Sequence, residues 1–79
     1  MNTVPKYDLT IQEGYNLFLE AVNFETTVVG FYANNFFNIK LNNNSEFVVE
    51  KTIANVGSVT ETSDIVFNAI FEILYKYNL

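Results

Sequence analysis

The chain has 79 residues, a formal net charge of −5 and neither Cys nor His. Without these residues it cannot form disulfides or thiolate metal sites, and it lacks the commonest metal ligand and the usual physiological proton shuttle. A domain this small buries only about 60% of its unfolded surface, so we expect its stability to depend on oligomerisation or on an unusually apolar core. The hydrophobic content of 49% and the eight Phe residues fit both expectations.

The first part of the chain predicts one helix. Residues 1–8, which contain the single proline, are expected to be an irregular lead-in. The Thr-Ile-Gln-Glu sequence that follows matches a capping box, with Thr10 as N-cap and Glu13 at the third helical position. Apolar side chains then recur at helical spacing and predict a helix from about Ile11 to Asn23. Gly14 lies inside it and should weaken it by roughly 1 kcal/mol relative to Ala.

Three strands are predicted next, because the pattern changes from helical spacing to alternation. Residues 26–33 are rich in β-branched and aromatic side chains, and Asn34-Asn35 can form a tight turn. Apolar and polar residues alternate over 37–42, and after a second turn residues 46–53 form the third strand. The predicted fold is therefore α+β: a helix, a three-stranded antiparallel meander and a helix, with both helices packed on one sheet face.

The predicted turn also assigns the two faces of this sheet. A two-residue turn at Asn34-Asn35 places Phe37 opposite Tyr32, and directly paired residues share a face. With an odd-length second loop, the core face would hold Val28, Tyr32, Phe37, Ile39, Leu41, Phe47 and Val49. Gly30 would leave room on that face for a helix. The other face would carry a second apolar patch around Phe31 and Phe36, and a one-residue slip would exchange the faces.

The C-terminal segment carries more apolar surface than a surface helix needs. Residues 54–59 read as a connection with room for a short extra strand, and residues 63–79 as a helix capped by Thr60, Thr62 or Ser63. One helical stripe is a normal core face, made of Ile65, Val66, Ala69, Ile70, Ile73, Leu74 and Tyr77. The second stripe is Phe67, Phe71 and Tyr75. The side chains left to face water are Asp64, Asn68, Glu72 and Lys76.

The second stripe predicts an interface. A surface helix is normally apolar on about a third of its circumference, and a chain this small cannot wrap a helix that is apolar on most of it. The stripe would therefore meet either a second copy of the chain or a different molecule. The alternative is that both stripes are internal, one against the sheet and the other against the first helix.

The sequence predicts no catalytic residues. Acid–base chemistry would fall to scattered carboxylates, Lys or Tyr, and the three glycines are isolated, so no phosphate-binding loop is present. Helix capping explains Glu61 and Asp64 without a calcium site. We therefore expect no enzyme activity, no cofactor and no metal.

Charge and hydropathy restrict the partners. The four Lys residues are far apart and there is no Arg, so direct nucleic-acid binding is not expected. The most apolar run, residues 65–75, is interrupted by polar residues and falls short of the about 20 residues that span a membrane. The N-terminus lacks the pattern of a signal peptide. We expect a cytoplasmic protein without a membrane partner, in the host cytoplasm if the chain is encoded by a phage.

The predicted function is therefore protein binding. Residues 1–79 would be a single α+β binding domain that sterically occupies a larger partner, with Phe71 and Tyr75 as anchor and acids such as Asp64 and Glu72 as rim. In size, charge and composition the chain is similar to phage-encoded inhibitors of bacterial defence, of the anti-CRISPR and anti-restriction type. The alternatives are a homo-oligomeric structural or accessory protein, in which Phe67, Phe71 and Tyr75 pack against a twofold copy, and an immunity protein or antitoxin that neutralises a toxin. We expect a homo-oligomer in either case.

Overall fold

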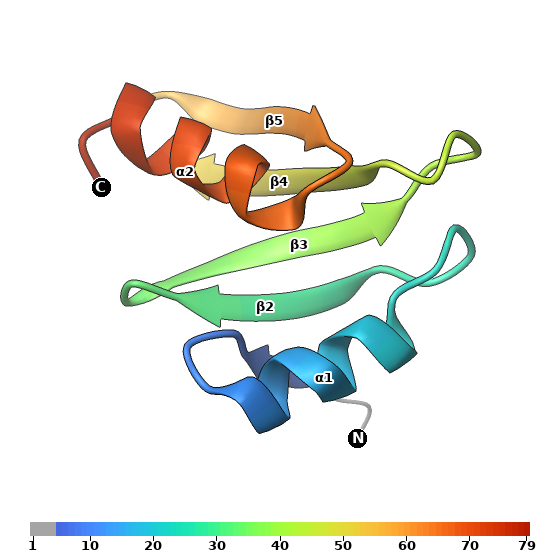
Figure 1. Cartoon of the computed structure of the whole chain (residues 1–79). Helices are drawn as coiled ribbons and strands as arrows, with labels where there is room; N and C mark the ends of the chain where they lie inside the picture. The colour runs from blue at the N-terminus through green and yellow to red at the C-terminus, as the bar shows by residue number, and fades with distance from the viewer. Residues whose placement is uncertain (1–4) are drawn as a thin grey trace, which may run out of the picture.

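The computed structural model describes residues 5–79, which form a five-stranded mixed sheet and two α-helices (Figure 1). In chain order the elements are β1 (Lys6–Asp8), α1 (Gln12–Ala21), β2 (Val28–Tyr32), β3 (Asn35–Leu41), β4 (Phe47–Ile53), β5 (Gly57–Ser63) and α2 (Val66–Lys76). The strands lie side by side in the same order, with β1 parallel to β2 and the other neighbours antiparallel. The predicted three-stranded meander is therefore wrong, because one further strand lies at each edge of the sheet.

The strand β1 replaces most of the predicted irregular lead-in. Lys6 lies opposite Val29 and Asp8 opposite Phe31, so β1 continues the sheet beyond β2. Because parallel neighbours require a crossover connection, α1 belongs to a β1–α1–β2 unit. A three-residue strand has no periodicity to detect, and its pairing depends on residues far along the chain. Residues 1–4 of the predicted lead-in lie outside the described residues.

The first helix begins without the predicted capping box. The carboxylate of Asp8 accepts hydrogen bonds from the hydroxyl of Thr10 and from its backbone N–H, the latter at 2.9 Å. These two bonds, the hydroxyl's first, hold the pKa of Asp8 below its usual range. Thr10 is therefore engaged before the helix, which has Ile11 as an extended N-cap residue with no side-chain capping bond. The helix ends at Ala21, two residues before the predicted Asn23.

The turn between β2 and β3 lies one residue earlier than predicted. Ala33 and Asn34 form it, with φ angles of 51° and 63°, and the side-chain amide of Asn35 donates to the carbonyl of Ala33 at 2.9 Å. Tyr32 consequently lies opposite Asn35, and Phe37 opposite Gly30. The register differs from the predicted one by two residues. Because side chains alternate with a period of two, every residue keeps its predicted face.

The strand β5 is much longer than the short extra strand that the sequence allowed. It pairs with β4 along its full length, from Phe47 opposite Ser63 to Ile53 opposite Gly57. The turn uses positive φ angles of 67° at Asn55 and 108° at Gly57. Because β5 extends to Ser63, α2 begins at Val66 and ends at Lys76, so it is shorter than the predicted helix over residues 63–79.

None of the three predicted capping side chains caps α2. Thr60, Thr62 and Ser63 all belong to β5, and the N-cap residue is Ile65, which makes no side-chain capping bond. The hydroxyl of Ser63 instead accepts the N–H of Ile65 at 3.1 Å, in the connection between β5 and α2.

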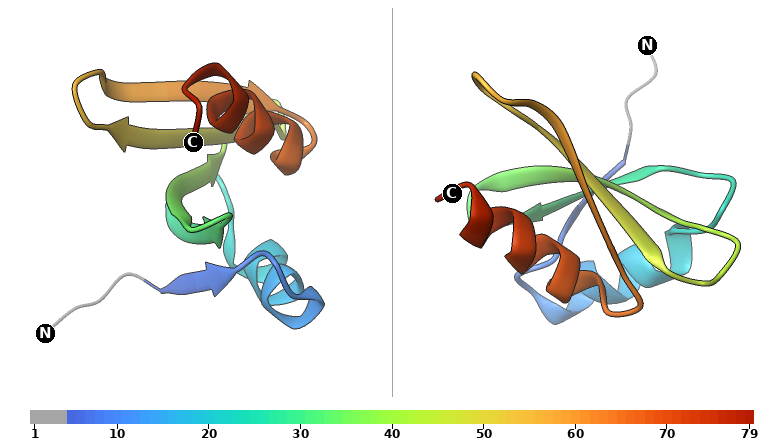
Figure 2. Two further views of the ribbon diagram at one scale, coloured as in Figure 1. Left: turned by 90° about the vertical axis from the view of Figure 1, so that its left-hand side faces the viewer. Right: turned by 90° about the horizontal axis from the view of Figure 1, so that it is seen from above.

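Both helices cover the same face of the sheet (Figure 2). Helix α1 packs against β1 and β2, and α2 packs against β4 and β5. Their shared core consists of Leu9, Phe18, Val22, Val28, Phe37, Ile39, Val49, Val66, Ala69, Ile70 and Ile73. The predicted core face of β2, β3 and β4 is confirmed, with Tyr32, Leu41 and Phe47 half-buried at its margins. Within residues 5–79 no helix covers the opposite face.

Two glycines allow close approach on the covered face. Gly30 leaves room for the side chain of Leu9, whose Cδ1 would lie 2.8 Å from an added Cβ. The predicted space for a helix is thus filled by the residue that links β1 to α1. Gly14 is buried in α1, where an added Cβ would lie 2.1 Å from the carbonyl oxygen of Asp8. That oxygen belongs to the backbone and cannot move aside.

We expect Gly14→Ala to destabilise the protein by roughly 1–3 kcal/mol, because the added methyl group must push α1 away from Asp8. At an open helix position the same change would stabilise by up to about 1 kcal/mol. Urea denaturation followed by circular dichroism measures the difference, with Glu20→Ala on the exposed side of α1 as the control. A Gly14→Ala protein as stable as the native one would contradict the close approach.

Candidate protein-binding site

The exposure of the second apolar stripe of α2 increases from its first residue to its last. Phe67 is half-buried, Phe71 is 46% exposed and Tyr75 is 89% exposed. The opposite side of the same helix is in the core, since Val66, Ala69, Ile70 and Ile73 are fully buried. The helix therefore has one side that stabilises the fold and one that increasingly faces water toward its C-terminal end.

The N-terminal part of the stripe is held by rings from α1 and β2. Phe67 stacks on Tyr15 of α1 with 5.5 Å between ring centroids and meets Tyr32 of β2 edge-on at 5.2 Å. Phe71 stacks on Phe67 and meets Tyr32 edge-on, both at 5.8 Å. We call Tyr15, Tyr32, Phe67 and Phe71 the aromatic cluster. It joins the two helices, and it fixes one side of the Phe71 ring while the other side remains exposed.

The exposed part of the stripe continues into the last residues. The N–H of Leu79 donates to the carbonyl of Leu74 at 2.9 Å, which folds the chain back beside the helix end. A shallow hollow of about 390 Å³ lies here, lined by Phe71, Leu74, Tyr75, Asn78 and Leu79. A second hollow of about 370 Å³ is lined by Asn68, Phe71, Glu72 and Tyr75. Phe71, Leu74, Tyr75 and Leu79 are called the α2 patch below, and Tyr75 stands between its two hollows.

The charge beside the α2 patch is negative. Glu72 is exposed and lines the second hollow with Phe71 and Tyr75. Lys76 points instead to β5, where its ammonium group lies 3.1 Å from the carboxylate of Glu61, and this bond and charge raise the pKa of Lys76. Asp64 precedes the other end of α2 and does not line either hollow. The structure thus brings Phe67, Phe71, Glu72 and Tyr75 together and leaves Asp64 apart.

The predicted patch at Phe31 and Phe36 lies on the opposite face of the sheet. The two rings pair across β2 and β3 with centroids 5.0 Å apart, and Phe36 is 48% exposed. The ammonium group of Lys6 lies 5.1 Å from the centroid of the Phe36 ring. A cation over the ring face partly occupies this surface. It is separate from the α2 patch, because the whole sheet lies between them.

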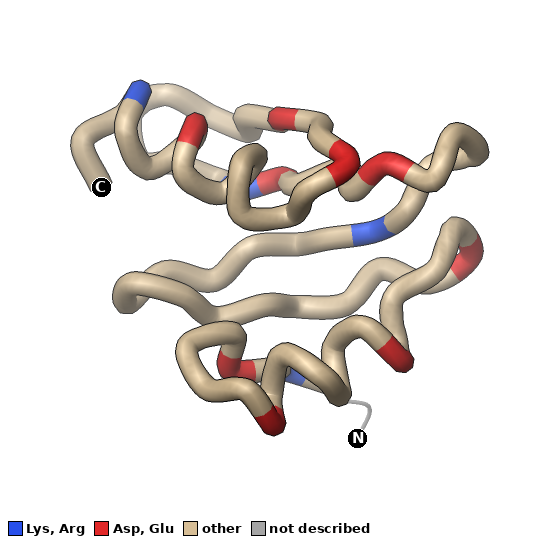
Figure 3. The backbone as a smooth tube through the Cα atoms, viewed as in Figure 1, with Lys and Arg blue, Asp and Glu red and all other residues tan. Residues whose placement is uncertain are grey.

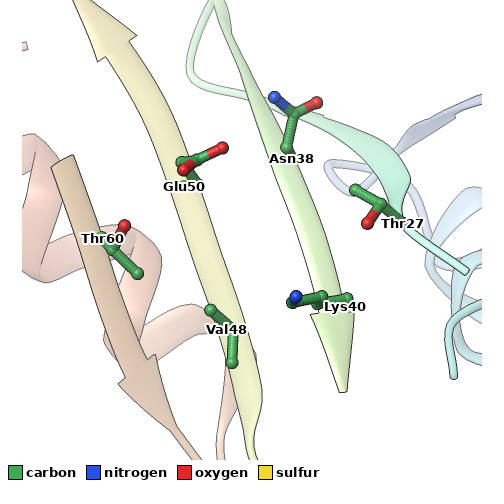
Figure 4. Close-up of a pocket in the computed structure, with 6 residues that line it drawn as sticks. All are labelled: Thr27, Asn38, Lys40, Val48, Glu50 and Thr60. Atoms are coloured by element: carbon green, nitrogen blue, oxygen red, sulfur yellow. The ribbon is translucent and has the colours of Figure 1, made fainter. Parts of the chain in front are cut away.

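A polar hollow on the uncovered sheet face was not predicted. It has a volume of about 190 Å³ and is lined by Thr27, Asn38, Lys40, Val48, Glu50 and Thr60 (Figure 4). These residues come from four separate segments, so only the correct strand pairing brings them together. The alternating polar residues of β3 and β4 were the feature of the sequence that could have indicated a polar surface here. One Lys and one Glu make this a mixed, solvated surface.

The acidic residues of the described chain are spread over both helices, the loops and the sheet (Figure 3). Among residues 5–79, no three acidic side chains converge in a group that could hold a metal ion. Neither helix in this part of the chain is long and apolar enough to cross a membrane. The predicted absence of metal, cofactor and catalytic activity stays a prediction.

No family model, no curated protein and no solved structure matches this chain.

We expect the two sides of α2 to differ sharply in their contribution to stability. Ile70→Ala should cost about 2–5 kcal/mol, since it opens a cavity in the core. Tyr75→Ala should cost less than about 0.5 kcal/mol, because the ring is almost fully solvated. Chemical denaturation of both variants tests this. Equal losses for the two would mean that the Tyr75 ring is buried.

Proposed function

We propose that this protein is a non-enzymatic binding domain that acts by covering a surface of a larger protein, with the α2 patch as its anchor. The observation that carries the proposal is the exposure of Tyr75 beside a half-exposed Phe71, on a helix whose other side is buried. Burying a large side chain of this kind contributes roughly 1.5–3 kcal/mol. Aromatic rings held in place by their neighbours, as Phe71 is held by Phe67 and Tyr32, are typical anchors of protein interfaces.

The charges around the patch favour a partner with Lys or Arg beside an apolar pocket. Glu72 lines the hollow next to Tyr75, and the positive charge of Lys76 is directed to Glu61 on β5. The chain as a whole carries −5. Acidic groups at the rim would attract a basic partner and orient it, and an Arg side chain could also stack on the exposed face of Tyr75.

A phage-encoded inhibitor of a bacterial defence system is the role that we favour for such a domain. The basis is an analogy of size, charge and composition, and steric cover of a basic surface would be sufficient for inhibition. An immunity protein or antitoxin bound to a basic toxin would use the same patch in the same way. A homo-oligomeric accessory protein would instead bury Phe71 and Tyr75 against a second copy, which would change the mass in solution.

The proposal predicts a partner whose binding depends on Tyr75 and not on other exposed aromatic residues. Immobilised native protein, Tyr75→Ser and Phe24→Ser are incubated with lysate of the cells in which the protein acts, and retained proteins are quantified by mass spectrometry. Phe24 is the matched control, because it is 64% exposed but lies in the connection between α1 and β2. We expect the native protein and Phe24→Ser to retain the same partner.

Tyr75→Ser should retain at least about tenfold less of that partner, because an anchor residue typically contributes that much to affinity. The purified partner is then titrated against the three proteins by calorimetry, which gives the affinities directly. A partner that binds Tyr75→Ser as tightly as the native protein, or the absence of any specifically retained protein, would contradict the proposal.

A further inference from the structure

The two edges of the sheet are built differently. The edge strand β1 has three residues, begins with Lys6 and follows Pro5 directly. Short length, lysine and proline are features that keep an edge strand from pairing with another chain. The other edge strand, β5, has seven residues and contains neither Lys nor Pro. Within residues 5–79 no strand lies on its outer side.

The residues of β5 favour pairing on that outer side. Val59, Thr60 and Thr62 are β-branched, which favours extended backbone, and regular pairing with β4 continues to Ser63. Glu61 provides the single charge of the strand, and the ammonium group of Lys76 lies 3.1 Å from it. The edge therefore has neither an unpaired charge nor a break in its pairing with β4 that would keep another strand from binding to it.

We propose that β5 pairs antiparallel with β5 of a second copy, which joins the two sheets into one. The longest overlap places the twofold axis at Thr60, the middle residue of the strand. Ser58 then lies opposite Thr62 of the partner subunit. These hydroxyl side chains belong to the uncovered face, because Thr60 lies opposite Glu50 and lines the polar hollow there. Pairs of Thr and Ser across antiparallel strands stabilise a sheet by hydrogen bonding.

A second copy fits this edge better than a charged or strongly apolar segment, because the uncovered face of β5 is complementary to itself. On that face the hydroxyl groups of Ser58, Thr60 and Thr62 would meet the same groups of the second copy. On the covered face the same register places Val59 opposite Glu61 of the partner subunit. The charge of Glu61 is already paired with Lys76 of its own chain. Helix α2 packs over β5 and β4, so the two copies of α2 would come alongside each other and enlarge the contact. A strand pair of this length is smaller than a standard interface, so we expect a dissociation constant of about 1–100 µM.

Self-association through β5 leaves the α2 patch free. Lys76 is on the side of α2 that reaches β5, whereas Phe71 contacts Tyr32 of β2 on the side toward α1. Dimerisation and binding of a foreign protein would therefore use different sides of the same helix. The inference is independent of the proposed function, and either can fail alone.

Analytical ultracentrifugation over a concentration series tests the dimer with variants that introduce charge on the uncovered face of β5. In Ser58→Lys/Thr62→Lys, each new Lys would meet a Lys of the partner subunit, and in Ser58→Glu/Thr62→Glu each Glu would meet a Glu. On β4 these positions lie directly opposite the uncharged Thr52 and Val48, and Glu50, opposite Thr60, is a diagonal neighbour of both. The free energy of unfolding of each variant is therefore measured beside its association. We expect either variant to dimerise at least about tenfold more weakly than the native protein. An equimolar mixture should dimerise again, because Lys then meets Glu.

The matched control is Asn38→Lys/Thr52→Lys, which adds the same charge to exposed residues of the same face, on the inner strands β3 and β4. It should dimerise like the native protein, as should Tyr75→Ser, and circular dichroism verifies that every variant is folded. A native mass of 9.1 kDa at all concentrations would overturn the proposal. So would unchanged dimerisation of the β5 variants, failure of their mixture to associate, or loss of the dimer in Tyr75→Ser.

Discussion

Ile70 and Ile73 of α2 are fully buried in one core with Phe37, Ile39 and Val49 from the middle of the sheet. The exposed surfaces follow from this packing. The two helices of residues 5–79 cover one face of the five-stranded sheet, and they leave the other face without a helix. The opposite face is then left to water, where β3, β4 and β5 present Asn, Lys, Glu and Thr residues beside the apolar pair Phe31 and Phe36. The same packing turns the opposite side of α2 outward.

The aromatic cluster fills the space between the two helices. The helices pack over opposite halves of the sheet, so the space between them has to be filled by side chains. Large rings do this: Phe67 reaches Tyr15 of α1 and Tyr32 of β2. Phe71 continues the stack but is only partly covered, and Tyr75 extends beyond it into solvent. One helical stripe thus changes from core to surface, and its exposed end is the part available to a partner.

Local periodicity made much of this fold predictable. Most of the core stripe of α2 and the faces of β2, β3 and β4 follow from spacings of 3.6 and 2, and a register error of two residues left the faces unchanged. Ile65 was wrongly assigned to that stripe: it precedes the first turn of α2 and is 55% exposed. The strand β1 was missed because three residues carry no period and pair with a distant segment. The length of β5 was underestimated because its sequence is rich in hydroxyl residues and has a single aliphatic residue, Val59. An edge strand can be this polar, but no apolar alternation then marks it. The predicted cap at Thr10 failed because Asp8 binds that residue instead.

The residues of the candidate site could be found from the sequence, but their exposure could not. Phe67, Phe71 and Tyr75 have equal spacing and similar chemistry, and they differ in exposure because α1 reaches one end of the stripe and not the other. That depends on the β1–α1–β2 connection, which places α1 over β1 and β2. The polar hollow and the open edge of β5 likewise depend on strand order, which no short-range pattern contains.

The accessibility of each aromatic ring in the free protein can be measured directly, and it decides whether one side of α2 is exposed. A soluble gadolinium chelate accelerates the NMR relaxation of ring protons that solvent can approach. We expect strong relaxation enhancement for Tyr75, an intermediate effect for Phe71, a smaller one for Phe67, and almost none for Phe18, which is fully buried. Enhancement at Tyr75 as low as at Phe18 would show that the ring is covered in the free protein, and it would contradict the division of α2 into a buried side and an exposed anchor.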